Sequence, residues 1–214
     1  IMKFHIVDVF AETRYSGNQL AVFVCSRVPP EAEMQLIARE INFSESAFIL
    51  PQKGEAEGWP VRIFTPLHEV DFAGHPTLGA AHVIQRELIK AEVPKLTLRL
   101  KVGPIPVEFS TGIGDPLWME QVAPTFGKTL PAGPLAAMLG LPAEAIDESW
   151  PVQEVSTGLP HIMVPLRSLE FLRRAKVDRD GYFRFIEKTW AKNILVFCLQ
   201  GRTANHAVSV RMFA

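Results

Sequence analysis

The sequence predicts an α+β protein of two similar lobes, each with a β-shell around a central helix. Residues 76–88 are small and apolar around most of a helical circumference, which is typical of a helix buried on nearly all sides. Short strand-like runs precede and follow this helix. The tetrapeptide VRIF at 61–64 is echoed by VRMF at 210–213, so the two halves of the chain are weakly repeated.

A segment rich in Pro and Gly at 123–134 marks the boundary between the lobes. We therefore expect an N-terminal lobe with its central helix at 2–125 and a partial C-terminal lobe at 126–214. Two halves built alike also predict a cleft between them, which is a common place for a ligand site.

The first elements follow from local patterns. Residues 3–10 and 20–25 are β-branched runs separated by the turn residues Ser-Gly-Asn at 16–18, so we expect two neighbouring strands in one sheet. Apolar residues then recur with helical spacing after a Pro-Pro pair, and glutamates occupy the first turn, where negative charge suits the helix dipole. A helix is predicted at 30–41.

Shorter strands surround the central helix in the remainder of the first half. AFIL and VRIF predict two strands around a turn-rich loop, and EVDF leads into the helix at 76–88. After that helix, KLTLRLKVG alternates leucines with polar residues, the period of a strand with one wet face. The segments IPVEFS and PLWMEQV predict two further strands, with a turn at 114–115 between them.

The second half repeats this order but stops early. Residues 156–166 align with 15–25, and 193–214 align with 45–66. The first half continues into its buried helix, whereas the second half stops at the equivalent strand. A shell without its helix would leave apolar side chains uncovered, and even single large-to-small core changes cost about 2–5 kcal/mol. We therefore expect an incomplete second lobe, a longer natural polypeptide, and no activity in a protein ending at Ala214.

Composition excludes several classes of partner. The chain has 22 basic and 23 acidic residues and a net charge of -1, so neither nucleic acid nor an anionic membrane is expected as a partner. No leader pattern and no run of about 18 apolar residues is present. Cys25 and Cys198 each lie in an apolar run, which predicts small buried hydrophobes in a reducing compartment. We expect a cytoplasmic protein.

Three segments carry polar residues at element boundaries: SGN at 16–18, NFSES at 42–46 and FAGHPTLGA at 72–80. Glu45 precedes an apolar strand, where burial could raise its pKa into the range of a general acid/base. Gly74 and His75 lie at the start of the buried helix, whose free N–H groups could hold a carboxylate. From the residues alone, a solvated turn residue is the commoner role for a glutamate such as Glu45. His75 could equally be a structural histidine that bonds a nearby carbonyl.

Metal and cofactor motifs are absent from the sequence. His68, His75 and His82 recur every seven residues, but no compact i, i+4 ligand pair and no C-x-x-C pair exists. Neither GxGxxG nor a Walker A pattern occurs. We therefore expect no metal site and no cofactor.

Taken together, the motifs resemble one known family. DVF at 8–10, SGNQLAV at 16–22, NFSES at 42–46, RIFTP at 62–66 and EVDFAGHPTLGAA at 69–81 occur in the order and spacing of the PhzF-like family, named for the phenazine-biosynthesis isomerase. The resemblance implies the diaminopimelate-epimerase-like fold, an active site in the cleft and a homodimer. The family continues through an acidic Gly-Ser-containing loop into a second central helix, which this sequence does not reach.

The resemblance also implies roles for five residues. Glu45 is the catalytic acid/base, and Gly74 and His75 bind the substrate. Asn18 and Ser44 line the cleft. Epimerase relatives use two cysteines instead, and neither cysteine here lies in the matching loop, so that mechanism is disfavoured.

Two functions remain open from the sequence. The first is a cofactor-independent isomerase that moves a proton within a small carboxylate-bearing substrate. The alternative is a noncatalytic member of the same fold that binds a small molecule or another protein. A reading frame that continues beyond Ala214 into an acidic loop would favour the enzyme.

Overall fold

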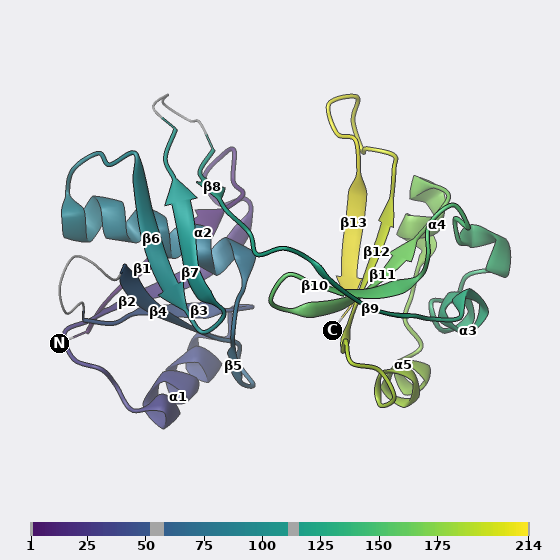
Figure 1. Ribbon diagram of the computed structural model, residues 1–214, viewed down its shortest axis with the longest axis horizontal. Coiled ribbons are helices and arrows are strands. Elements are labelled where there is room, and N and C mark those ends of the chain that lie inside the picture. Colours follow the sequence, from purple (N-terminus) through teal and green to yellow (C-terminus); the bar gives the residue numbers. More distant parts are fainter. Residues whose placement is uncertain (1, 52–57, 111–115, 214) are drawn as a thin grey trace. The chain divides into compact units, whose positions relative to one another are not determined.

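The computed structural model describes residues 2–51, 58–110 and 116–213 (Figure 1). The chain forms two compact units, Ile1–Val122 (unit 1) and Ala123–Ala214 (unit 2). The division follows residue 122, whereas the sequence prediction places it after residue 125. The turn predicted at 114–115 and most of the loop before the VRIF strand lie outside the described residues.

Unit 1 is built on one strongly mixed sheet. Its strand order is β1-β2-β3-β4-β6-β7-β8, with β5 pairing to β4. The predicted neighbours β1 and β2 pair antiparallel along their whole length, which confirms that prediction. The strands are β1 (Met2–Val9), β2 (Asn18–Cys25), β3 (Ser46–Ile49), β4 (Trp59–Phe64), β5 (Glu69–Val70), β6 (Lys95–Leu100), β7 (Gly103–Glu108) and β8 (Trp118–Met119).

One face of this sheet packs against α1 (Glu31–Ile41), the helix predicted at 30–41. The helix ends at Asn42, which adopts the left-handed conformation and donates its N–H to the carbonyl of Ala38. The buried cluster on this face contains Cys25, which is 6% exposed, so this cysteine is the small buried hydrophobe expected.

The other face covers the predicted central helix, α2 (Gly74–Val83), which continues as a π-helix at Ile84–Ile89. Seven of the ten residues of α2 are buried. The small side chains of α2 allow the strands of the sheet to approach the helix closely. A Cβ at Gly79 would lie 2.5 Å from Cδ2 of Leu20 and 3.0 Å from Cγ2 of Val9. The absence of a side chain at Gly79 therefore sets the distance between helix and sheet.

Replacing Gly79 by Val should lower the free energy of unfolding by about 1–3 kcal/mol, because added methyl groups overpack a close contact. Urea denaturation measures this loss. The matched control is Gly133→Ala on an exposed helix position, where an added Cβ would meet nothing within 4 Å. That change should leave the free energy of unfolding close to that of wild type, because Gly133 lies exposed in the first turn of α3. If Gly79→Val were as stable as wild type, the close packing of α2 on the sheet would be contradicted.

Unit 2 has a smaller sheet with helices on one face. The strand order is β13-β12-β11-β10-β9. Its three α-helices contribute to one buried cluster together with Cys198, which is fully buried as predicted. The elements are β9 (Thr125–Thr129), α3 (Ala132–Met138), a 3-10 turn (Ala143–Ala145), β10 (Gln153–Ser156), β11 (Pro160–Pro165), α4 (Leu169–Arg174), α5 (Arg179–Ile186), β12 (Asn193–Cys198) and β13 (Ser209–Phe213).

The topology of unit 2 supports the internal repeat. Strands β11 and β12 run parallel and β12 and β13 antiparallel, as do β2 with β3 and β3 with β4. Residues that the internal repeat matches between the two halves also occupy equivalent positions in the strand pairings of the two units. The matched positions on one face are Met163 with Val22, Leu195 with Ala47, Phe197 with Ile49, Val210 with Val61 and Met212 with Ile63.

This matched face is covered in unit 1 only. Its residues in unit 1 are at most 3% exposed beneath α2, whereas Val210 and Met212 in unit 2 are 55% and 56% exposed. The helices of unit 2 pack on the opposite face. Within the described residues, no helix of unit 2 covers this matched face.

Several elements differ from the sequence prediction. The predicted strands at 69–72 and 116–122 are reduced to two residues each in β5 and β8. The helices of unit 2 were not predicted, because each has only six to eight residues. Two of these helices begin at a residue that caps them. The side chain of Ser168 accepts a hydrogen bond from the backbone N–H of Phe171, and the side chain of Asp178 accepts one from the backbone N–H of Gly181. No helix in the described residues has the length and apolar character needed to cross a membrane.

Candidate active site

Three of the predicted site residues meet in unit 1, each placed by the end of an element. Asn18 begins β2, Glu45 immediately precedes β3, and His75 lies in the first turn of α2. The parallel pairing of β2 with β3 brings the first residues of both strands to the same end of the sheet. Because α2 packs on that sheet with its first turn at this end, residues far apart in the sequence become neighbours.

The polar atoms of these residues are close and only partly paired. Nδ2 of Asn18 lies 3.2 Å from Nδ1 of His75. Nε2 of His75 lies 3.6 Å from Oε2 of Glu45, longer than a hydrogen bond. The His75 side chain is 7% exposed and that of Glu45 is 19% exposed. Neither Nε2 nor Oε2 has a hydrogen-bond partner among the described residues, although both atoms are buried. Unpaired buried polar atoms are costly, so their clustering indicates a ligand site.

Burial shifts the two titrating groups in opposite directions. Loss of hydration raises the pKa of Glu45 above its usual 4.5. Burial lowers the pKa of His75 from 6.5 to about 4, and a hydrogen bond with the backbone of Gln19 offsets part of this effect. His75 is therefore neutral near pH 7. Because burial raises its pKa, the Glu45 carboxyl holds a proton at higher pH than an exposed glutamate does.

A neutral imidazole has one N–H, and its neighbours determine which nitrogen carries it. The Asn18 amide contacts Nδ1 of His75, and Nε2 is the ring nitrogen that faces Glu45. Asn18 is then the residue that orients the ring. Its position in the SGNQLAV motif indicated a site residue, but the motif did not indicate this contact.

Replacing Asn18 by Asp should raise the pKa of His75 by roughly 1–3 pH units, because a carboxylate beside the ring favours the imidazolium form. NMR titration of the His75 ring protons measures the change. Asn205→Asp, on an exposed loop of unit 2, is the matched control and should leave His75 unaltered. An unchanged pKa in Asn18→Asp would place Asn18 away from the ring in solution.

The start of α2 supplies backbone donors beside this pair. In the described part of the chain, no side chain caps this helix. The N–H groups of the first residues of a helix have no intrahelical partner, and the helix dipole favours negative charge there. A Cβ at Gly74 would lie 3.3 Å from Cε of Met119, so the Met119 side chain forms an apolar wall against the helix start. No motif in the sequence marks Met119 as a site residue.

The two serines of the NFSES motif are placed differently. Ser44 is exposed and lies next to Glu45, and its role in lining a site stays a prediction. Ser46 is fully buried, and its hydroxyl has no partner among the described residues. Strand alternation places Ser46 on the face opposite to Glu45, together with residues packed on α1. Ser46 is therefore not part of the same cluster.

The cysteines have no reactive setting. Both thiols are free and buried. Burial, and more weakly the charge of Glu33, raises the pKa of Cys25 to about 11, so this thiol stays protonated near neutral pH. No group of three or more His, Cys, Asp or Glu side chains suited to a metal ion occurs among the described residues.

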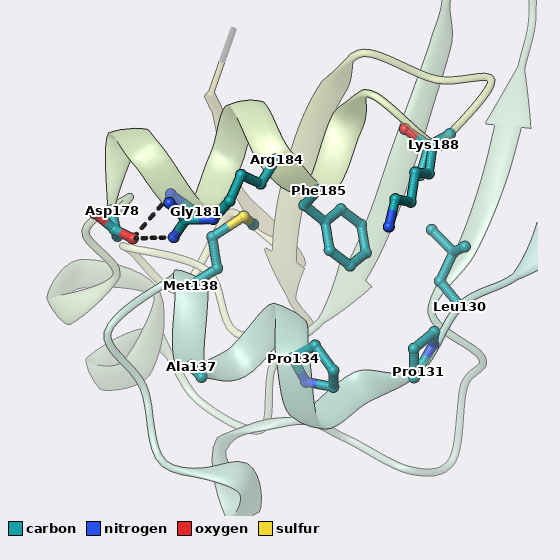
Figure 2. Close-up of a pocket in the computed structure, with 11 residues that line it drawn as sticks. Leu130, Pro131, Pro134, Ala137, Met138, Asp178, Gly181, Arg184, Phe185 and Lys188 are labelled. Atoms are coloured by element: carbon teal, nitrogen blue, oxygen red, sulfur yellow. Dashed lines mark hydrogen bonds and ion pairs between the residues drawn. The ribbon is translucent and has the colours of Figure 1, made fainter.

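An open pocket of about 560 Å³ lies in unit 2, between α3 and α5 (Figure 2). Apolar residues such as Met138 and Phe185 form its walls, and Lys188 reaches over it. Arg184 points instead toward Asp178, with 4.0 Å between the charged atoms. None of the predicted site residues lines this pocket, and it lacks a carboxylate and imidazole pair comparable to that of unit 1.

Comparison with known proteins connects this arrangement to a family. Residues 7–214 match the family model described as "Phenazine biosynthesis-like protein". An uncharacterised isomerase of Mesorhizobium japonicum is 32% identical over 97% of this chain and 71% of its own length. The trans-2,3-dihydro-3-hydroxyanthranilate isomerase of Pseudomonas fluorescens is 33% identical over 84% of this chain. The match spans 63% of that enzyme, so this chain is similar to a part of it.

Solved structures agree in fold. A PhzF family protein of Bacillus anthracis superposes with a TM-score of 0.82 at 28% identity, over all of this chain and 72% of that protein. A probable proline racemase of Agrobacterium radiobacter has a TM-score of 0.63 at 10% identity, which shows a shared fold alone. The epimerase-like two-lobed architecture predicted from the sequence is thereby confirmed.

Proposed function

This chain belongs to the phenazine biosynthesis-like protein family, whose relatives are named as isomerases, and on that premise we propose that it moves a proton within a small molecule that bears a carboxylate. Glu45 is the acid/base in this proposal. Gly74 and His75 bind the substrate, and Asn18 and Ser44 lie around it. The reaction needs no cofactor and no metal, because the carboxyl group alone can take up and return a proton.

The observation that carries the proposal is the pair of buried, unpaired atoms Oε2 of Glu45 and Nε2 of His75. A structural ion pair would join these atoms by a hydrogen bond and would keep the imidazole charged. Here the ring is neutral, and the carboxyl has its pKa raised by burial. Such a carboxyl suits a group that must exist in both protonation states during one reaction.

The chemical step balances within the substrate and Glu45. The Glu45 carboxylate takes a proton from a substrate carbon, and the electrons of the broken C–H bond enter the unsaturated system of the substrate. The protonated Glu45 then delivers the proton to a different atom, which yields an isomer and regenerates the carboxylate. His75 stays neutral throughout, with Nε2 toward the reacting pair.

The start of α2 holds the carboxylate of the substrate. This assignment uses the free backbone donors of that helix and avoids any need for lysine or arginine. Met119 places apolar side-chain atoms beside these donors. Substrates with a small ring or a short chain beside the carboxylate fit this proposal.

Benzoate and anthranilate should therefore bind, and His75→Ala should weaken binding by roughly 10-fold or more, since hydrogen bonds to charged groups contribute about 1.5–3 kcal/mol. Isothermal calorimetry measures both affinities. His82→Ala is the matched control on the same helix, about 10 Å farther along its axis. Equal affinity in His75→Ala and wild type would count against the proposed carboxylate site.

We also propose a cytoplasmic protein that acts as a homodimer, without nucleic acid or membrane as a partner. The two free buried thiols and the near-zero net charge support this setting.

A further inference from the structure

The register of a short strand places Met119 beside the start of α2. Strand β8 pairs antiparallel with β7, and Met119 lies directly opposite Val107, which is fully buried in the cluster that includes α2. Directly opposite residues of paired strands have their side chains on the same face of the sheet. The Met119 side chain therefore points toward α2. The preceding residue, Trp118, points to the other face and is 65% exposed.

Backbone hydrogen bonds tie β8 and the start of α2 to one hairpin. The N–H of Glu120 donates to the carbonyl of Pro106 at 3.0 Å, which continues the pairing of β7 and β8 beyond the strand itself. The N–H of Val102, between β6 and β7, donates to the carbonyl of Asp71 at 3.3 Å, in the segment that leads into α2. The same hairpin thus positions the helix start and the strand that carries Met119.

The methyl group of Met119 lies where a side chain of residue 74 would otherwise extend. A Cβ at Gly74 would be 3.3 Å from Cε of Met119. In this first turn Pro76 has no N–H, and the N–H of Thr77 donates within the helix. The N–H groups of Gly74 and His75 therefore remain without an intrahelical partner. A carboxylate that accepts from these two groups would have its attached carbon atoms next to Met119.

A second observation indicates a ligand at this helix start. The His75 side chain is 7% exposed, and its Nε2 has no hydrogen-bond partner among the described residues. A buried polar atom without a partner is costly unless a ligand or water satisfies it. The backbone donors and this ring nitrogen thus mark the polar part of a site, and Met119 is its apolar neighbour.

Methionine suits contact with the body of a carboxylate ligand. Its side chain is unbranched, with three rotatable bonds, so the thioether can adapt to the outline of a ring, and its polarisable sulfur makes favourable contacts with aromatic groups. The same atoms fill space beside the helix start. A ligand with a larger group next to its carboxylate would have to displace them.

We infer that Met119 is a specificity-determining residue of this site: its thioether packs against the group attached to the substrate carboxylate and restricts that group to a single small ring or a short chain. The inference rests on the proposed carboxylate site at the start of α2. It concerns which carboxylates bind, whereas Glu45 concerns how the proton moves.

The test compares acetate, benzoate and 2-naphthoate, which has a second fused ring, by isothermal calorimetry on the full natural polypeptide. Met119→Ala should raise the affinity for 2-naphthoate relative to benzoate by about 10-fold or more, because even one methylene in an apolar pocket changes binding by roughly 10–200-fold. Acetate should bind both proteins equally. Met119→Leu conserves volume and should keep the wild-type ratio. Trp118→Ala, on the opposite face of the same strand, is the matched control and should also keep it.

NMR of the methionine methyl groups gives a second test on wild type. A ring that packs against the thioether should shift the Met119 methyl resonance on addition of benzoate, whereas acetate should leave it nearly unmoved. Met119→Leu assigns the resonance. Met34 is the internal control, because it is fully buried on the α1 face of the sheet and should not respond to either ligand.

The outcomes separate this inference from the proposed function. If His75→Ala weakens benzoate but Met119→Ala leaves the ratio of affinities unchanged, the carboxylate site stands and the role of Met119 is overturned. Equal weakening of all three carboxylates by Met119→Ala would overturn it as well, because a general loosening of the site does not select by size. So would a Met119 resonance that saturating benzoate does not shift. Equal affinity for benzoate in His75→Ala and wild type would overturn both proposals.

Discussion

In the full natural polypeptide, Glu45→Gln should lower isomerase turnover by about 10²–10⁴-fold, because the amide keeps the size of the side chain and cannot take up or return a proton. The thermal midpoint should stay close to that of wild type. Oε2 of Glu45 has no hydrogen-bond partner in the described residues, so the substitution breaks no structural contact. The assay follows trans-2,3-dihydro-3-hydroxyanthranilate, the compound in the name of a 33% identical relative.

The matched control is Glu40→Gln, an exposed glutamate near the end of α1. It should retain wild-type turnover and stability. Unaltered turnover in Glu45→Gln would remove Glu45 from the reaction. Loss of turnover together with a large drop in the thermal midpoint would instead make Glu45 a structural residue.

Acid should destabilise unit 1 through His75. The ring has a pKa of about 4 when folded and an ordinary value of 6.5 when unfolded. Between these values the unfolded chain binds a proton that the folded chain does not, so the free energy of unfolding falls as pH falls from about 6.5 to 4. At about 1.4 kcal/mol for each pH unit, the loss is about 3 kcal/mol.

This loss is measured by comparing wild type with His75→Asn, which does not titrate. Urea denaturation at several values between pH 7 and pH 4 should show the stability of wild type falling toward, or below, that of the variant by about 3 kcal/mol. The raised pKa of Glu45 acts in the opposite sense, since the protonated carboxyl favours the folded state. Glu45 is present in both proteins, so its effect largely cancels. Parallel pH profiles would show that His75 is not buried as described.

The sequence predicted the fold because its strongest signals are periodic. The small residues of α2 leave the helix without a polar side, which predicts a helix buried on nearly all sides. The VRIF and VRMF repeat identified β4 and β13, and their pairing with β3 and β12 follows the same register. The short helices of unit 2 gave no such signal. A helix of six to eight residues is held by its packing, which local sequence does not express.

The site was predictable in part. The motifs identified Asn18, Glu45 and His75, but not the contacts among them. The hydrogen bond between Asn18 and His75 exists because the start of β2 lies beside the first turn of α2, a consequence of tertiary packing. The direction of both pKa shifts also depends on burial, which the exposed-looking sequence NFSES does not indicate for Glu45. The role of Ser44 in lining the site stays a prediction. The contribution of a second lobe to the site also stays a prediction.

The decisive measurement is an NMR-monitored reaction in D₂O with trans-2,3-dihydro-3-hydroxyanthranilate, in the absence of added metal or cofactor. Wild type, produced as the full natural polypeptide, should convert the compound to an isomer in which one carbon has gained a hydrogen isotope, while a different carbon has lost its proton. Glu45→Gln should leave the spectrum unaltered over the same period. Conversion by Glu45→Gln at the wild-type rate would contradict proton transfer by Glu45. Binding of the compound by wild type without any conversion would instead support a noncatalytic member of the family.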